Sequence, residues 1–239
     1  MTDRRPPEMS WAERAAERSP MVQRSRARGV EQARAIVEAA QRLIAAKGSG
    51  FTTQELVKEA GIALQTFYRY FGGKDQLILA VIENMVTESA VQFREEVRDV
   101  DDPVARLRFH VTSVVKLLAD RGDSESPRFM ATEHWRLQAL YPEEIAQASK
   151  SYSDLLQEEI DAAVHAGLLQ PADPAYAAWL VTQLVMAVFH YYAFVSPAEP
   201  YDVIAGRLWD FCVAGLGGQR DQAVESQPRT LKRVGSRSR

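Results

Sequence analysis

Hydrogen-bonding side chains gather between Thr52 and Lys74, in a stretch that also carries four aromatic rings. Gln65 and Arg69 are four residues apart, so on a helix they share one face. The glutamine amide can donate to and accept from a base edge, and the arginine can reach guanine or a phosphate. Hydroxyl and ammonium donors suited to phosphate oxygens come from Thr52, Thr53, Tyr68, Tyr70 and Lys74. These residue types therefore indicate contact with double-stranded DNA.

Two short helices joined by a tight turn must present these groups. Thr52 and Glu55 fit a capping box, so one helix is expected to begin there and to end at Gly61. A second helix over residues 64–71 stops at Gly72, and its phenylalanines can pack inward. This layout is typical of a helix-turn-helix, whose second helix enters the major groove. Spacing alone leaves one alternative, a helical hairpin whose aromatic rings all lie in the core.

The remaining chain predicts helices and nothing else. An apolar stripe from Val30 to Ile44 predicts a first helix of about five turns. A long helix is expected from Lys74 to about Arg98. Further helices are expected over residues 103–121, 128–140, 142–166, 176–195 and 201–216. No segment alternates apolar and polar residues with β-branched enrichment, so the predicted fold class is all-α.

Composition and charge divide the chain into four predicted parts. Residues 24–78 carry nine Lys or Arg and five Asp or Glu, and they form the expected helix-turn-helix domain. Residues 79–217, an acidic helical body, are expected to bind an effector and to dimerise. Residues 1–23 are expected to be a flexible leader and residues 218–239 a disordered basic tail. A polyanion should therefore meet the N-terminal domain.

The location of the protein is predicted from its N-terminus and its single cysteine. Residues 1–29 are charged and lack the apolar core of a signal peptide. Cys212 has no partner for an internal disulfide, which fits a reducing compartment. A cytoplasmic protein is therefore expected.

The arginines at positions 24, 26 and 28 precede the expected first helix. They could form an arm that reaches the minor groove, or they could belong to a leader whose charges are merely solvated.

The run Phe51–Ile62 (FTTQELVKEAGI), continued by TFYRYFGGKDQL over residues 66–77, resembles the DNA-binding domain of the TetR (tetracycline-repressor-like) family. The resemblance covers roughly residues 30–78, whereas the body is similar only in the number and order of its helices. It implies a homodimer that reads a palindromic operator, more often as a repressor than as an activator. It also implies a small-molecule effector that releases the DNA.

By this resemblance, a set of polar residues would contact the DNA backbone and a second set would lie nearest the bases. The backbone set is Thr52 or Thr53, Thr66, Tyr68, Tyr70 and Lys74, and the base set is Leu64, Gln65 and Arg69. The chain departs from the family at Ala63, where a small polar residue is common. The recognition helix should therefore lack a side-chain cap, and Leu64 suggests van der Waals contact, for example with a thymine methyl group.

Residues Tyr176–Val195 form an uncharged stretch of about twenty residues, long enough to span a bilayer. Thr182, Gln183 and His190 interrupt it, and no positive charge flanks it. A helix that is apolar all round also suits a subunit interface. No membrane contact is therefore expected, and the resemblance implies that this helix and Tyr201–Leu216 pair with their copies in a second subunit.

The resemblance also implies an effector pocket among the middle helices, and composition suggests that it is largely apolar. Candidate lining residues are Phe109, His110, Phe129, Met130, His134, Trp135, Trp179, Gln183, Met186 and His190. Aromatic and methionine side chains at helical spacing equally suit a core, so both interpretations stay open.

No motif for catalysis is found. The sequence has no glycine-rich phosphate loop and no nucleophile elbow, and its four histidines lack metal-ligand spacing. No catalytic residue, metal or cofactor is therefore expected. The alternatives to a regulator are a helical adaptor that binds protein and an all-α enzyme without DNA binding.

Overall fold

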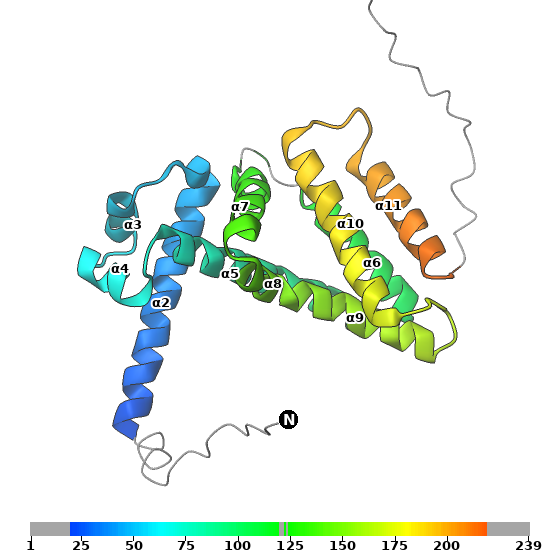
Figure 1. Ribbon diagram of the computed structural model, residues 1–239, viewed down its shortest axis with the longest axis horizontal. Coiled ribbons are helices and arrows are strands. Elements are labelled where there is room, and N and C mark those ends of the chain that lie inside the picture. The colour runs from blue at the N-terminus through cyan, green and yellow to red at the C-terminus, as the bar shows by residue number, and fades with distance from the viewer. Residues whose placement is uncertain (1–19, 120–121, 123, 219–239) are drawn as a thin grey trace, which may run out of the picture.

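The computed structural model describes residues 20–119, 122 and 124–218, and within them every regular element is helical. The predicted all-α class is therefore confirmed. The N-terminal part comprises α2 (Pro20–Lys47), the short 3-10 helix η1 (Gly48–Gly50), α3 (Thr53–Glu59) and α4 (Leu64–Tyr70). The long helix α5 (Lys74–Glu96) leads from this part into the body (Figure 1).

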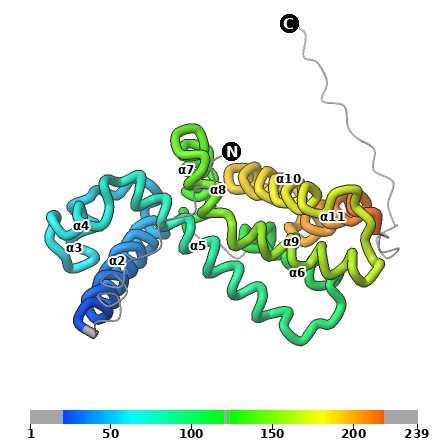
Figure 2. Tube along the Cα trace, turned by 60° about the horizontal axis from the view of Figure 1, so that its bottom comes forward, coloured from blue at the N-terminus to red at the C-terminus, as the bar shows by residue number. Residues whose placement is uncertain are grey.

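The body is a stack of helices that pack on α5 and on one another. It comprises α6 (Pro103–Lys116), α7 (Ser126–Leu140), α8 (Pro142–Ala148), α9 (Lys150–His165), α10 (Pro174–Phe194) and α11 (Tyr201–Gly215). In Figure 2 the helices α9, α10 and α11 lie on the side of the molecule away from α3 and α4, with α7 and α8 between the two groups. The two halves of the molecule thus meet at α5, α7 and α8.

Two apolar clusters form the core, and the first of them joins the two halves. The first joins Ile36 of α2 and Phe67 of α4 to Leu77 of α5, and it also contains Phe129 of α7 and Ile145 of α8. The second lies among α5, α6, α9, α10 and α11. The predicted domain boundary after residue 78 stays a prediction. The apolar packing of the first cluster continues across this position into α7 and α8.

Two predicted helix boundaries and one predicted inward residue are wrong. Helix α2 begins at Pro20, so Arg24, Arg26 and Arg28 stand on a helix and not on a flexible leader or arm. Val30, expected on the inward stripe, is 55% exposed. Helix α6 ends at Lys116 instead of near residue 121. The leader residues 1–19 and the tail from residue 219 lie outside the described part of the chain.

The predicted single helix over residues 142–166 is in fact two helices that meet at Ser149. Ile145 and Ala148 of α8 belong to the first apolar cluster, whereas Tyr152 and Leu155 of α9 belong to the second. These four side chains have the spacing of one helix face, and the change from the first cluster to the second falls at the break at Ser149.

Helix α10 is the one helix of the described residues that is long and apolar enough, by length and composition, to cross a bilayer. It packs against α6, α7 and α9, where Val185 and Ala193 are fully buried. Such a helix is also found in the core of proteins that have no contact with a membrane.

Candidate DNA-binding face and ligand cavity

Local sequence signals build the helix-turn-helix as predicted. The Glu55 amide donates to the Thr52 hydroxyl at 3.2 Å, and the Thr52 amide donates to the Glu55 carboxylate at 2.8 Å, which completes the capping box. The Lys47 ammonium and these Thr52 bonds lower the pKa of Glu55 to about 2. Gly61 has a φ of +64°, a conformation that favours glycine, at the turn between α3 and α4.

Helix α4 has one buried and one exposed face. Phe67 and Phe71 are buried, and their rings stack at 5.9 Å against the first apolar cluster. The opposite side presents Tyr68, which is 55% exposed, and Leu64, which is 46% exposed. Gln65 and Arg69 are exposed as well. The three side chains expected nearest the bases and Tyr68, expected at the DNA backbone, therefore all lie on the solvent side of the helix.

The N-terminus of α4 lacks a side-chain cap, as predicted. Ala63 is the N-cap residue and makes no capping hydrogen bond. Thr66 and Thr53, both expected to contact the DNA backbone, are half-buried on α4 and α3. Thr52 is exposed, but its hydroxyl already serves the capping box. Thr52 and Thr53 thus stand at the start of α3, and Thr66 stands on a half-buried side of α4.

Arg69 and Tyr70 are tied to the first helix by a residue that sequence reasoning missed. The Gln32 side-chain oxygen accepts from the Tyr70 hydroxyl at 2.9 Å and from the Arg69 guanidinium at 3.2 Å. The Arg69 guanidinium also lies 5.1 Å from the Tyr70 ring centroid. No local pattern reveals Gln32, because its partners are at least 37 residues away along the chain.

Lys74, which is expected to contact the DNA backbone, makes hydrogen bonds within the protein. Its ammonium donates to the carbonyl oxygens of Ser49 at 2.7 Å and Phe51 at 2.8 Å, and it lies 4.3 Å from the Phe51 ring centroid. An ammonium has three donors, so one remains for a phosphate oxygen. In the free protein these bonds join η1 and the loop before α3 to the start of α5.

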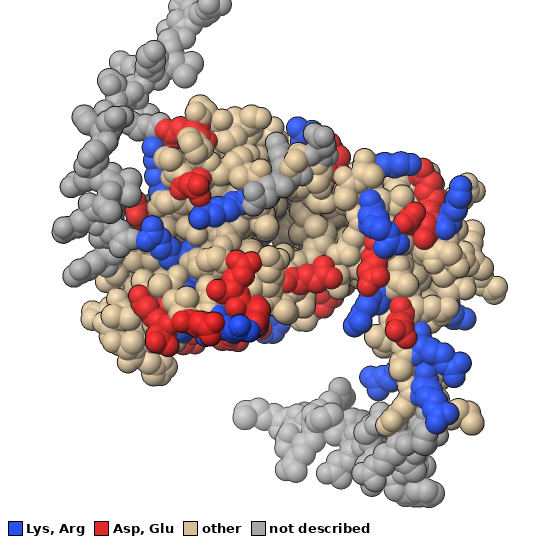
Figure 3. All heavy atoms as spheres, turned by 180° about the vertical axis from the view of Figure 1, so that it is seen from behind, with Lys and Arg blue, Asp and Glu red and all other residues tan. Residues whose placement is uncertain are grey.

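Charge is distributed as the composition predicted. Figure 3 shows basic side chains gathered along the N-terminal part of α2 and a band of acidic side chains across the body. Arg24, Arg26 and Arg28 are exposed on that helix. The positive potential therefore lies on the half of the molecule that carries α4.

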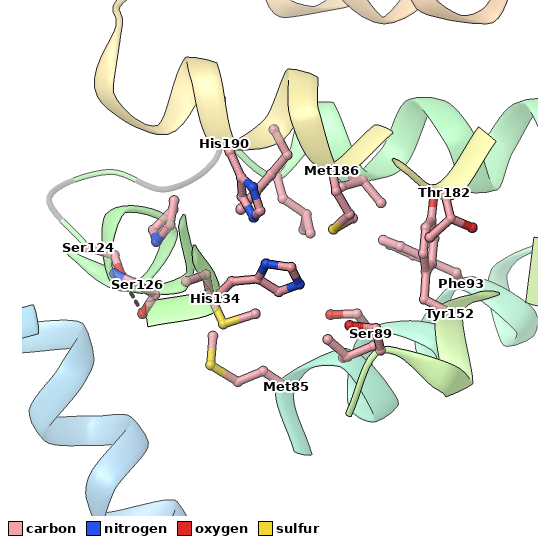
Figure 4. Close-up of a pocket in the computed structure, with 17 residues that line it drawn as sticks. Met85, Ser89, Phe93, Ser124, Ser126, His134, Tyr152, Thr182, Met186 and His190 are labelled. Carbon is pink, nitrogen blue, oxygen red and sulfur yellow. Dashed lines mark hydrogen bonds between the residues drawn. The ribbon is translucent and has the colours of Figure 1, made fainter. Parts of the chain in front are cut away.

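The body contains a partly open cavity of about 310 Å³ among α5, α6, α7, α9 and α10 (Figure 4). Its wall is mainly methionine, phenylalanine and aliphatic side chains, with serine, threonine and tyrosine hydroxyls and two histidines between them. None of the described residues that line it is an Asp, Glu, Lys or Arg. The size and the few polar groups are typical of a site for a small molecule.

Four of the candidate residues lie on this wall: Met130, His134, Met186 and His190. The other six do not. Phe129 is buried in the first apolar cluster, Phe109 packs on the second, and His110 is fully buried with its Nε2 atom 3.7 Å from the Glu159 carboxylate. Trp135, Trp179 and Gln183 are exposed. The exposure of these three side chains follows from their position around the helix, because the residues at positions 134, 182 and 186 occupy the side that faces inward.

Several lining residues were missed by sequence reasoning. Helix α5 supplies Met85, Ser89 and Phe93, and α9 supplies Tyr152. The four-residue spacing on α5 marks one helix face and could have predicted these three residues. Tyr152 has no comparable signal, because a tyrosine at helical spacing on α9 suits the core equally well.

The two histidines form a pair at the α7–α10 contact. Their ring centroids are 4.9 Å apart, and Figure 4 shows His134 reaching into the cavity with His190 directed toward it. Burial and then the neighbouring His134 lower the pKa of His190 to about 4, and burial lowers the pKa of His134. Both rings are therefore neutral at pH 7. The Nδ1 atoms of both are buried and have no hydrogen-bond partner.

Two family profiles match the chain. Residues 36–81 match the profile of bacterial regulatory proteins of the tetR family, and residues 100–216 match a tetracyclin repressor-like C-terminal domain. The transcriptional regulator BetI from Brucella canis is 32% identical over 75 residues, which are 31% of this chain and 38% of BetI. The aligned segment thus spans less than half of that curated relative.

Solved structures show the same fold. FadR from Bacillus subtilis, in complex with stearoyl-CoA, has a TM-score of 0.63 at 16% identity, with 76% of this chain and 97% of FadR covered. A tetR-family regulatory protein from Rhodococcus RHA1 has a TM-score of 0.54 at 26% identity, with 80% and 98% covered. Since both halves match their profiles in the expected order, the chain belongs to the TetR family of bacterial transcriptional regulators.

Proposed function

We propose that the protein is a homodimeric DNA-binding regulator, a repressor that leaves a palindromic operator when a small, largely apolar ligand enters the cavity. The observation that carries the proposal is the exposed face of α4, with Leu64, Gln65, Tyr68 and Arg69 opposite a buried phenylalanine pair. In this proposal Gln65 and Arg69 read bases and Leu64 contacts one, while phosphates are bound by Thr52, Thr53, Thr66, Tyr68, Tyr70 and Lys74. The protein acts in the cytoplasm.

A second copy of the chain is the proposed partner of α10 and α11. These helices expose several large apolar side chains: Tyr176, Trp179, Leu180, Tyr191, Phe194, Val203 and Phe211. Exposed apolar side chains in this number are unusual on a monomer and common at a subunit interface. Pairing of α10 and α11 with their copies would place two α4 helices on one face of the dimer.

Ligand binding would reach the DNA through α7 as well as α5. The Glu125 amide, at the start of α7, donates to the Ala45 carbonyl of α2 at 3.2 Å. Farther along α7, Arg136 donates to Asp75 of α5 at 2.6 Å. The cavity residues Met130 and His134 lie between these two attachments. A ligand that favours a different position of α7 would therefore move the two α4 helices away from a spacing of one DNA turn, roughly 34–36 Å.

An apolar ligand is supported by the wall of the cavity. FadR from Bacillus subtilis, which has the same fold, was solved with stearoyl-CoA, a ligand with a long apolar chain. The wall of the cavity in this chain is mostly apolar and carries no charge in its described residues. We therefore expect an apolar molecule, of a size that about 310 Å³ can hold.

Selection of bound duplexes from a random pool tests this function. We expect enrichment of a two-fold symmetric sequence, with binding that weakens steeply as salt rises because phosphate contacts release counterions. The double variant Gln65→Ala/Arg69→Ala should enrich no such sequence. A protein that retains no duplex, and binds a protein partner without dependence on salt, would instead be an adaptor.

A further inference from the structure

The polar groups of the cavity are unevenly used by the protein itself. The Thr182 hydroxyl donates to the Ala178 carbonyl at 2.9 Å, and the Tyr152 hydroxyl donates to the His110 carbonyl at 3.2 Å. Ser124 and Ser126 bond each other at 3.1 Å. By contrast, the Nδ1 atoms of His134 and His190 are buried without a partner. A buried polar atom in this condition costs free energy that a ligand can recover.

The two rings together offer a particular combination of donor and acceptor. A neutral imidazole has one N–H donor and one nitrogen acceptor. The centroids of the His134 and His190 rings are 4.9 Å apart, and His190 is 8% exposed. A single small group lying against both rings could accept from one and donate to the other, and a hydroxyl has this capacity whereas an ether or a hydrocarbon does not.

The rest of the wall favours an aromatic body attached to that hydroxyl. Phe93 and Phe189 line the cavity, and so do Met85, Met130 and Met186. Phenylalanine rings pack edge-to-face with other rings, and methionine sulfur makes favourable contacts with ring edges. A flat ring system therefore gains more from this wall than a flexible polar molecule of the same size.

Charged ligands are disfavoured by the same wall. No described lining residue carries an opposite charge, and an ion transferred into an apolar site without a partner is strongly destabilised. A metal ion would need more than two histidines, and the described residues contain no group of three or more His, Cys, Asp or Glu side chains able to hold one.

We propose that the ligand of this cavity is an uncharged hydroxyaryl compound whose hydroxyl is bound between His134 and His190. The inference deepens the proposed function, because it rests on the cavity being the effector site. His134 stands on α7, so a ligand held by this pair would also be held by the helix that is bonded to α2 and α5.

Calorimetric titration of the full-length protein tests the proposal with probes of matched shape. 2-Naphthol and 4-phenylphenol are the hydroxyaryl probes, naphthalene and biphenyl are their hydrocarbon analogues, and 2-naphthoate is the charged analogue. We expect at least one hydroxyaryl probe to bind about tenfold more tightly than its hydrocarbon analogue, the effect of one or two buried hydrogen bonds. The carboxylate should bind more weakly still.

Substitutions identify the side chains that cause the preference for a hydroxyl group. His134→Phe and His190→Phe should reduce the preference for the hydroxyl to about twofold or less. His190→Gln, which keeps a donor and an acceptor, should retain part of the preference even if a phenylalanine variant folds poorly. His165→Phe is the matched control, since His165 is exposed at the end of α9 and does not line the cavity. It should leave all affinities unchanged.

The outcomes separate this inference from the proposed function. If neither hydroxyaryl probe binds, or if both bind no better than their analogues, the inference is overturned while selection of a duplex can still succeed. If no duplex is selected, the regulator function fails, and the titrations still decide which ligand the cavity prefers. An unchanged preference in both phenylalanine variants would also overturn the role of the histidine pair.

Discussion

The Lys74 ammonium donates to the Phe51 carbonyl at 2.8 Å, which ties the loop before α3 to the first turn of α5. Lysine at this position is expected to bind phosphate, yet two of its three donors already bond protein carbonyls. The same side chain stabilises the N-terminal helices, and in the proposed function it also contacts DNA. These two effects can be measured separately.

Lys74→Ala should lower the free energy of unfolding by about 1–3 kcal/mol, because two carbonyl groups lose a charged donor. It should also weaken binding to all duplexes about equally, since phosphate contacts carry no sequence information. Urea unfolding and fluorescence anisotropy at several salt concentrations measure the two effects. Lys58→Ala, at an exposed position of α3, is the control. A variant as stable as the parent protein would contradict the structural role.

Gln65→Ala should relax sequence preference at one base pair of each half-site, by about 1–3 kcal/mol of discrimination. Its effect on binding to unrelated duplexes should be small. Repeating the duplex selection with this variant measures the change, with Gln54→Ala on the exposed side of α3 as the matched amide control. An unaltered preference would show that Gln65 does not read bases.

Tyr70→Phe and Gln32→Ala should have similar and non-additive effects on DNA affinity. Both remove the bond of 2.9 Å between the Tyr70 hydroxyl and Gln32, which also accepts from Arg69. Each single variant should weaken specific binding by about 1 kcal/mol, and the double variant should weaken it by little more. Fluorescence anisotropy with the selected duplex measures the affinities of the parent protein, the two single variants and the double variant, which together form a double-mutant cycle. Fully additive losses would mean that the two side chains act independently.

Stability should fall in mild acid because of His190. Its pKa is about 4 in the folded protein, below the ordinary 6.5, so the unfolded chain binds the additional proton between these values. The contribution of neutral His190 to the free energy of unfolding is complete above pH 6.5 and is lost as the pH falls toward 4. Between pH 7 and pH 5 the loss is roughly 2 kcal/mol. Urea unfolding should show a smaller loss for His190→Phe than for the parent protein, and equal losses would contradict the assignment.

Charge placed on the exposed face of α10 or α11 should break the proposed dimer. Leu180→Glu and Phe211→Glu change side chains that are 48% and 68% exposed, so the fold of each subunit should survive. Sedimentation velocity should then show monomers and DNA affinity should fall. Val91→Glu, at a 60% exposed position of α5, is the control for added charge on an apolar surface residue. Persistent dimers in both variants would place the interface elsewhere.

Some of this protein is determined by neighbours along the chain. The capping box of Thr52 and Glu55, the turn at Gly61 and the buried pair Phe67 and Phe71 depend on residues within a few positions of one another. Helix caps and apolar periodicity are local interactions, which is why the all-α class and the helix-turn-helix could be predicted from sequence.

Tertiary packing decided the rest. The bonds from Lys74 to Phe51 and from Tyr70 to Gln32 join residues 23 and 38 positions apart, and the His134–His190 contact joins two helices that are far apart in the chain. Helical phase placed His134 on the cavity wall and left Trp135 outside it. Sequence alone could suggest histidines and aromatics for a pocket. Only the packing of α7 against α10 brought two imidazoles together, because side chains distant in sequence meet when helices pack.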